Sequence, residues 1–333
     1  SASRPPPRCN APRATHGVMT KALRHPVSPA GLYRAVRDAL RRKSHVEMPP
    51  PTCSLLGLEY ERYGSLCLAT LLLSGALVFA YNSGAFGTKT NAEISKKYET
   101  LFTPAGWAFA IWSVIYASEL AATGFMVFAQ PSALLATASP PFVLTHVLQA
   151  VWTVAFEREL TSLSAVVLTG VAASTVCCMR ILAGAVDLER HLVLVPLSLH
   201  AGWTVAAALL SWNVAVRALD CPLSAQLALA FASVYASVGA AVAAFVVPLD
   251  GQGSLAPGAF FAAVAWALFA IGAEAERRTE VWWPIREAMR YSAWAAAAVV
   301  GALFCVRQAE GYLRCTGLGE ALCPAGTGGP EDA

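Results

Sequence analysis

Long apolar blocks separated by short polar connectors dominate the chain after residue 62. Eight blocks occur, at 63–81, 104–128, 140–157, 161–183, 192–218, 223–247, 256–273 and 289–307. Each approaches the length of about 20 residues that a helix needs to cross a bilayer, and none shows the period-two alternation of a membrane β-barrel. The pattern therefore predicts an all-α integral membrane protein. Because blocks 140–157 and 256–273 are short, it leaves seven or eight spans open.

The composition supports the membrane class and locates the positive charge. Hydrophobic residues make up 56% of the chain and charged residues only 14%, whereas soluble domains carry about 25% charged residues. Ten Lys or Arg residues fall within residues 1–50, against two acids, Asp38 and Glu47. The net charge of +3 therefore belongs mainly to this end and does not indicate a nucleic-acid partner.

Residues 1–61 form a basic, Pro- and Arg-rich N-terminal segment. Arg-rich, acid-poor sequence is typical of an organelle transit peptide. Two alternatives stay open: a disordered basic tail, and sequence upstream of a true start at Met48. On the first interpretation we expect the protein in an organelle membrane, of a plastid or a mitochondrion.

The connectors between the blocks differ in charge. Those after the first, third, fifth and seventh blocks hold nine Lys or Arg residues, whereas the others hold only Arg180 and Arg190. The positive-inside rule places the basic connectors in the cytoplasm-like compartment. The basic N-terminal segment favours the opposite orientation, and we follow the connectors.

Three blocks carry polar and aromatic side chains at helical spacing, so each forms a stripe along one helix face. The stripes are Phe109, Trp112, Tyr116, Glu119 and Thr123 in the second block, His146, Gln149, Thr153 and Phe156 in the third, and His200, Thr204, Ala207 and Ser211 in the fifth. Polar side chains are costly toward lipid, so we expect the stripes to face a shared cavity. Aromatic walls with a few polar groups suit a flat, mostly apolar ligand.

Ten residues are predicted to line this cavity: Trp107, Phe109, Trp112, Tyr116, Glu119, His146, Gln149, Trp152, His200 and Trp203. Several have alternative roles. Glu119 at mid-membrane could be a neutral or hydrogen-bonded acid that joins helices, because a charge there costs about 2.5–3.5 kcal/mol. His146 and His200 could form interhelical hydrogen bonds or ligate a haem iron. Trp107 could be an interfacial anchor.

The second block carries a family signature. In "YETLFTPAGWAFAIWSVIY", a Pro precedes Trp–x–Phe and then Trp and Tyr, at Pro104, Trp107, Phe109, Trp112 and Tyr116. This stretch resembles the loop and second helix of the TspO/MBR family, the translocator proteins and tryptophan-rich sensory proteins. It is the most specific part of the resemblance.

Two further segments resemble the same family more loosely. "QAVWTVAF" is similar to its third helix, and "PLSLHAGWTVAAALLSWN" is similar to its fifth helix through Trp203 and Ala207. Gln149 and Ser211 stand where the family usually has Asn, and His200 stands where Tyr is common. These departures put in doubt any ligand contact that the family makes through those Asn residues.

The resemblance implies a TspO-like five-helix bundle over residues 62–218. Residues 219–310 would add about three further transmembrane helices, and residues 311–333 would form a flexible tail. The bundle would enclose a pocket for porphyrins, haem or sterol-like molecules. No cofactor is required, no metal site and no catalytic residue are assigned, and haem or porphyrin is expected only as a ligand.

Two functions from different classes follow. The first is a protein that binds, senses or translocates a tetrapyrrole or other flat lipophilic molecule. The second is an integral subunit or assembly factor of an organelle membrane complex, such as a photosynthetic one. A membrane enzyme ranks third, because no Walker loop, HExxH, Gly–x–Ser–x–Gly or Cys–x–x–Cys motif occurs. The expected partners are the bilayer and a lipophilic small molecule, with a homodimer or larger complex left open.

Overall fold

Eight long apolar helices make up most of the structure. The computed structural model describes residues 63–83, 89–128, 132–185, 187–247, 256–279 and 281–316. Within these ranges, eight helices are long and apolar enough to cross a membrane. The all-α membrane fold is thereby confirmed, with eight candidate spans. The predicted N-terminal segment 1–61 and most of the tail, residues 317–333, lie outside the described residues.

The spanning helices follow one another with short connectors, apart from the longer one between α2 and α4. They are α2 (Tyr63–Asn82), α4 (Ile111–Phe128), α5 (Ala133–Glu157), α6 (Thr161–Ile181), α8 (Val195–Ala218), α9 (Leu223–Val246), α10 (Gly258–Arg277) and α11 (Trp283–Thr316). Shorter elements are α3 (Asn91–Lys97), the 3-10 helices η3 (Gly106–Ala110) and η4 (Leu182–Gly184), α7 (Asp187–Glu189) and the π-helical turn η5 (Arg190–Leu194).

Helix α5 begins earlier than the hydrophobic pattern predicts. The block was expected at 140–157, but the helix starts at Ala133. Ser132 caps it by accepting a hydrogen bond from the Leu135 amide at 3.5 Å. Pro140 and Pro141 then lie inside the helix, where two backbone donors are missing. Because prolines usually mark a helix start, the sequence pattern placed the boundary one to two turns too late.

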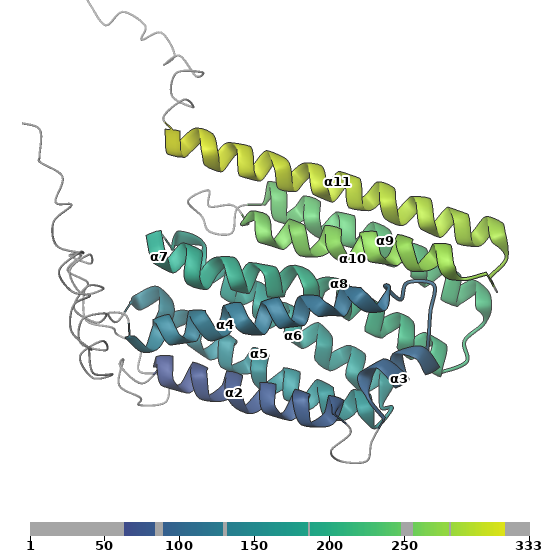
Figure 1. The fold of residues 1–333 in the computed structure, drawn as a ribbon, viewed down its shortest axis with the longest axis horizontal. Coiled ribbons are helices and arrows are strands. Elements are labelled where there is room, and N and C mark those ends of the chain that lie inside the picture. The colour runs from purple at the N-terminus through teal and green to yellow at the C-terminus, as the bar shows by residue number, and fades with distance from the viewer. Residues whose placement is uncertain are drawn as a thin grey trace, which may run out of the picture. The chain divides into compact units, whose positions relative to one another are not determined.

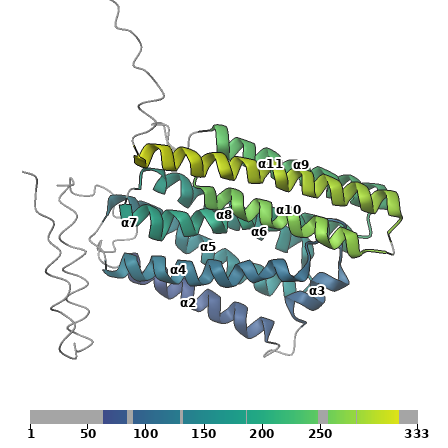
Figure 2. The same ribbon diagram turned by 45° about the horizontal axis from the view of Figure 1, so that its top comes forward.

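Helix α8 lies at the centre of the described bundle. It contacts α4, α6, α9 and α10, and Figures 1 and 2 show it between the α2–α4 side and the α9–α11 side. Helix α5 packs against α2 and α6, while α11 packs against α9 and α10. Successive spans run antiparallel, so the α2–α4 connector, which includes α3, lies at the same end as the connectors that follow α5, α8 and α10 (Figure 1).

Close helix packing depends on small residues at two contacts. A Cβ built on Gly64 of α2 would lie 2.5 Å from the Met126 carbonyl oxygen of α4. A Cβ on Gly202 of α8 would overlap the Phe260 carbonyl oxygen of α10. Glycine at such contacts lets two helix backbones approach each other in a membrane, where dispersion contacts hold helices together.

The C-terminal helices also contact the segment that leads into α4. The Ala105 amide donates to the Ala270 carbonyl at 3.1 Å, and the Trp266 indole donates to the Ala108 carbonyl at 2.9 Å. Helix α10 is therefore joined both to α8 and to η3. The predicted division into residues 62–218 and 219–310 stays a prediction about domains, across which these contacts run.

Candidate ligand cavity and buried histidine cluster

A cavity of about 470 Å³ lies inside the bundle, at the end that holds α3. Its volume is within the range of small-molecule sites, about 300–1,000 Å³. The walls come from α2, α3, the start of α4, the second halves of α5 and α8, α6 and the end of α10. The lining residues from the predicted set are Phe109, Trp112, Tyr116, Gln149, Trp152 and Trp203.

Aromatic rings hold the cavity walls in fixed relation to one another. The Trp203 ring meets Phe109 edge-on at 5.8 Å and Trp112 edge-on at 6.2 Å, between ring centroids. On the α5 side, Trp152 stacks on Phe156 at 5.4 Å. Such pairs each add about 0.5–1.5 kcal/mol beyond the area they bury. The walls are therefore a rigid, flat-sided surface.

Four polar atoms in these walls are buried and have no protein partner. They are the Tyr116 hydroxyl, Gln149 Oε1, Trp152 Nε1 and Trp203 Nε1. A buried polar group without a partner costs about 1–3 kcal/mol. Two of the four can only donate, the hydroxyl can do either, and the amide oxygen can only accept. The cavity is thus suited to a ligand that carries oxygen acceptors on an otherwise apolar body.

Helix α3 forms part of the cavity wall. Thr90 and Glu93 form a capping box at its start, where the Thr90 amide donates to the Glu93 carboxylate at 2.7 Å. Asn91, Ser95, Lys96 and Glu99 contribute to the cavity lining. This part of the cavity wall is therefore a short helix that is stabilised by its own N-terminal capping box.

Two acidic residues tie α3 to the rest of the protein. Glu159 accepts hydrogen bonds from Lys89 at 2.6 Å, from Tyr98 at 2.5 Å and from Lys97. These three donors lower the pKa of the Glu159 carboxyl from 4.5 to about 2. Glu99 pairs with Arg278 at 2.9 Å. Glu159 also has a positive φ of 57°, so its backbone is held in a conformation that non-glycine residues seldom adopt.

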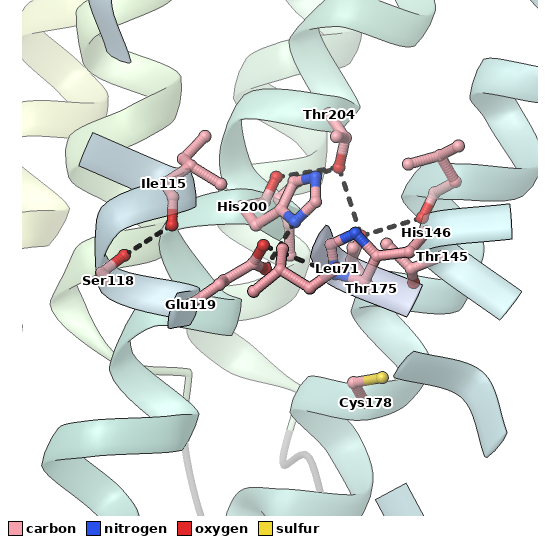
Figure 3. Close-up of polar contacts among 12 residues, drawn as sticks. Leu71, Ile115, Ser118, Glu119, Thr145, His146, Thr175, Cys178, His200 and Thr204 are labelled. Carbon is pink, nitrogen blue, oxygen red and sulfur yellow. Dashed lines mark hydrogen bonds and ion pairs between the residues drawn. The ribbon is translucent and has the colours of Figure 1, made fainter. Parts of the chain in front are cut away.

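Beneath the cavity, three ionisable side chains from three spans meet (Figure 3). Glu119 Oε1 of α4 lies 2.7 Å from His200 Nδ1 of α8, and Glu119 Oε2 lies 3.6 Å from His146 Nε2 of α5. His146 Nδ1 lies 3.2 Å from the Ser74 hydroxyl of α2. The three ionisable side chains are at most 1% exposed. We call Glu119, His146 and His200 the buried cluster.

The family is decided by a comparison with family models. One described as TSPO-like protein matches residues 65–306. The chain belongs to the TSPO-like family. No curated protein and no solved structure shows a significant match to it.

The match extends the resemblance beyond residues 62–218. It covers α9 and α10 and most of α11, so the three C-terminal spans of this TSPO-like protein are part of what identifies it. Their contacts to α8 and η3 give a physical reason, since they complete the packing of the helices that form the cavity. The protein is a multi-pass membrane protein of this family.

The structure places the ten predicted cavity residues in three groups. Six line the cavity, as described above. Glu119, His146 and His200 lie one helical turn deeper and contact one another. Their geometry therefore fits the alternative role, in which they join helices by polar contacts, better than a position in the cavity wall. Neither histidine is among the lining residues, so an axial bond to the iron of a haem in this cavity has no geometric support.

Trp107 lies outside the cavity. The residue is 38% exposed, and its ring meets Trp266 edge-on at 4.8 Å and Phe269 at 6.2 Å, between ring centroids. Its helical phase explains this, because Trp107 precedes Phe109 on a 3-10 helix, which turns the two rings toward different neighbours. Trp107 is positioned to dock α10 onto η3. For the other members of the predicted set, ligand binding stays a prediction.

Several lining residues were missed by sequence reasoning. They are mainly the polar residues of α3 and the last turns of α8 and α10, among them Leu210, Val214 and Glu274. The capping box at Thr90 and Glu93 was a readable signal for α3. Ser211 was assigned to a stripe but not to the site. Among the described residues, no group of three or more His, Cys, Asp or Glu side chains is arranged to hold a metal ion.

Proposed function

We propose that this TSPO-like protein binds a flat, largely apolar ligand with oxygen acceptors, of the tetrapyrrole or sterol-like class, and senses or translocates it. The observation that carries the proposal is the cavity of about 470 Å³ with four unpartnered polar atoms in aromatic walls. A ligand carbonyl or carboxylate would satisfy the buried donors, and its ring faces would contact the indoles.

The position of the cavity supports exchange of ligand with one side of the membrane. Its mouth lies at the end where α3 and the basic connectors meet, with Lys96 and Glu99 at the rim. By the positive-inside rule this end faces the cytoplasm-like compartment. Helix α3 would then act as the lid through which the ligand enters from that compartment or from the adjacent leaflet.

A direct binding experiment tests the proposal. Purified protein in nanodiscs is titrated with protoporphyrin IX, haemin and cholesterol, with tryptophan fluorescence as the readout. The variant Ala207→Phe places a ring inside the cavity, because Ala207 is one of its lining residues. We expect it to weaken binding by about tenfold or more, equal to about 1.4 kcal/mol.

A matched variant controls for nonspecific partitioning. Ala173→Phe makes the same change at an exposed position of α6 and should bind as the unmodified protein does. Equal binding by both variants, or saturable binding of none of the three ligands, would contradict the proposal. In that case a subunit role in a membrane complex becomes the better hypothesis, with copurifying proteins or pigments as its readout.

The buried aromatic stripes favour the binding role over the subunit role. A complex subunit would present such stripes to its partners, whereas here the rings of Trp112, Trp152 and Trp203 surround the cavity. Residence in an organelle membrane, an oligomeric state and any enzymatic step stay predictions.

A further inference from the structure

The buried cluster is not used by the proposed binding function. Its members come from α4, α5 and α8, yet none is among the residues that line the cavity. In a membrane, ionisable residues inside a helix bundle are costly and commonly mark proton or ion pathways. A purely structural contact would not need three ionisable groups, because neutral hydrogen-bonding side chains can join helices.

Hydrogen-bond geometry limits where the protons can lie. The Ser74 hydroxyl contacts His146 Nδ1 at 3.2 Å, and which of the two donates depends on the histidine tautomer. When the hydroxyl donates to the Leu71 carbonyl at 3.0 Å, His146 Nδ1 carries the proton. His146 Nε2 then faces Glu119 Oε2 at 3.6 Å with a lone pair, unless a further proton lies between them. Glu119 Oε1 and His200 Nδ1 share another proton at 2.7 Å.

Counting charges shows that one proton decides the net charge of the cluster. With neutral imidazoles and an ionised Glu119 the cluster carries one buried negative charge, and an added proton on Glu119, on His146 or on the unpartnered His200 Nε2 cancels it. A second added proton would leave the cluster positive. Burial favours the neutral state, since an unpaired charge in a low-dielectric interior is costly.

Few other charges influence the cluster. Glu119 interacts electrostatically with the Tyr116 phenol on α4 and with the Cys178 thiol on α6. Cys178 interacts in turn with the Cys67 thiol of α2. Glu119 contacts the two histidines, and no Lys or Arg of the described ranges is paired with it. The proton count therefore sets the local field.

The cluster also contacts the cavity floor. His200 meets the Trp112 ring edge-on at 5.6 Å, and Trp112 lines the cavity. Tyr116 and Gln149, which also line it, lie one helical turn from Glu119 and His146 on the same helices. A negative group on a ligand at the floor would thus be within a few ångströms of the cluster and would favour an added proton.

We propose that Glu119, His146 and His200 form a buried proton-binding site that takes up a proton when the cavity binds an acidic ligand. The proton comes from bulk water and forms an O–H or N–H bond within the cluster, and no other bond changes. The site itself is independent of the proposed function, while its coupling to ligand rests on that function. Acidification then strengthens binding of a carboxylate-bearing ligand, because binding and proton uptake are linked.

A pH titration of the ligand-free protein tests the site. Protonated imidazole quenches a neighbouring indole, so the fluorescence difference between the unmodified protein and Trp112→Phe reports the state of His200. We expect this difference to fall as the pH is lowered, because a protonated imidazole is the stronger quencher. His200→Gln and Glu119→Gln should each abolish the transition, whereas His191→Gln, a matched change at an exposed residue, should retain it. A difference signal independent of pH, or one unchanged in both cluster variants, overturns the proposed site.

Calorimetry tests the coupling. Mesoporphyrin IX and its dimethyl ester are titrated into the protein in two buffers of different ionisation enthalpy. When the diacid binds, the unmodified protein should take up a fraction of a proton, up to about one per bound ligand, whereas His200→Gln should take up none. Binding of the ester should cause no proton uptake in either protein. Binding of the diacid without proton uptake overturns the coupling and leaves the binding function intact. Absence of binding by either porphyrin contradicts the tetrapyrrole function, and the pH titration then decides the proton site alone.

Discussion

Replacing Glu119 by alanine or by glutamine should separate the two things that its carboxylate does. Alanine removes the 2.7 Å hydrogen bond to His200 and the 3.6 Å contact to His146, and leaves the buried His200 Nδ1 without a partner. Glutamine keeps the shape, an acceptor for His200 and a donor for His146, and removes only the charge. The pair therefore compares loss of the contact with loss of ionisation.

The structure sets the expected magnitudes. Each buried nitrogen left without a partner costs about 1–3 kcal/mol, and removal of one partner from a fully buried ionic group costs about 3–5 kcal/mol in total. We therefore expect Glu119→Ala to lower the free energy of unfolding by about 3–5 kcal/mol. Glu119→Gln should cost about 1 kcal/mol, because the hydrogen bond to His200 can re-form as a neutral bond.

Reversible unfolding in mixed detergent micelles, followed by near-ultraviolet circular dichroism, measures both values. A double-mutant cycle with His200→Ala then isolates the pair, and residues in direct contact should couple by at least about 0.5 kcal/mol. Equal losses for the alanine and glutamine variants, or a loss below about 1 kcal/mol for alanine, would show that the cluster does not hold the three helices together.

Two other predictions concern helix packing and the lid. Gly202→Ala should destabilise the protein by about 1–3 kcal/mol, because its methyl group would overlap the α10 backbone. Gly124→Ala, with open space around it, should be neutral or stabilise by up to about 1 kcal/mol, and thermal unfolding distinguishes the two. The protection of the α3 amides, which is their hydrogen-exchange rate compared with the intrinsic rate at the same pH, should be full above about pH 4.5 and be lost as the pH falls toward 2, because the pKa of Glu159 is lowered to about 2. In Glu159→Gln this protection should be low and insensitive to pH over that range, and strong protection there would show that Glu159 does not hold α3 in place.

The membrane fold could be predicted because hydrophobic length is a direct physical signal. Spans need continuous apolar sequence, and the eight blocks provide it. Boundaries were less accessible. The third apolar block was placed at 140–157, but α5 begins at Ala133 and contains Pro140 and Pro141, because a membrane helix tolerates proline where other groups satisfy the freed carbonyls.

The sequence predicted which side chains face the interior of the bundle, but not where along the bundle axis each of them lies. Spacing along a helix tells which side chains share a face, so Trp112, Tyr116 and Gln149 could be assigned to one cavity. It does not tell how far along the bundle axis two helices are offset. Glu119 and His200 therefore appeared as wall residues, whereas the offset of α4 and α8 brings them within 2.7 Å of each other.

The close packing of α10 against α8 means that the C-terminal helices support the helices that form most of the cavity. Gly202 and Trp203 are neighbours in the chain, one against the α10 backbone and one in the cavity, so any sideways slide of α10 would tilt the indole beside it. In a fragment that ends after Ala218, Gly202 would face lipid acyl chains instead of α10, and Glu274 would be missing from the cavity lining. In this protein, a five-helix piece would keep its aromatic signature and still have an altered pocket.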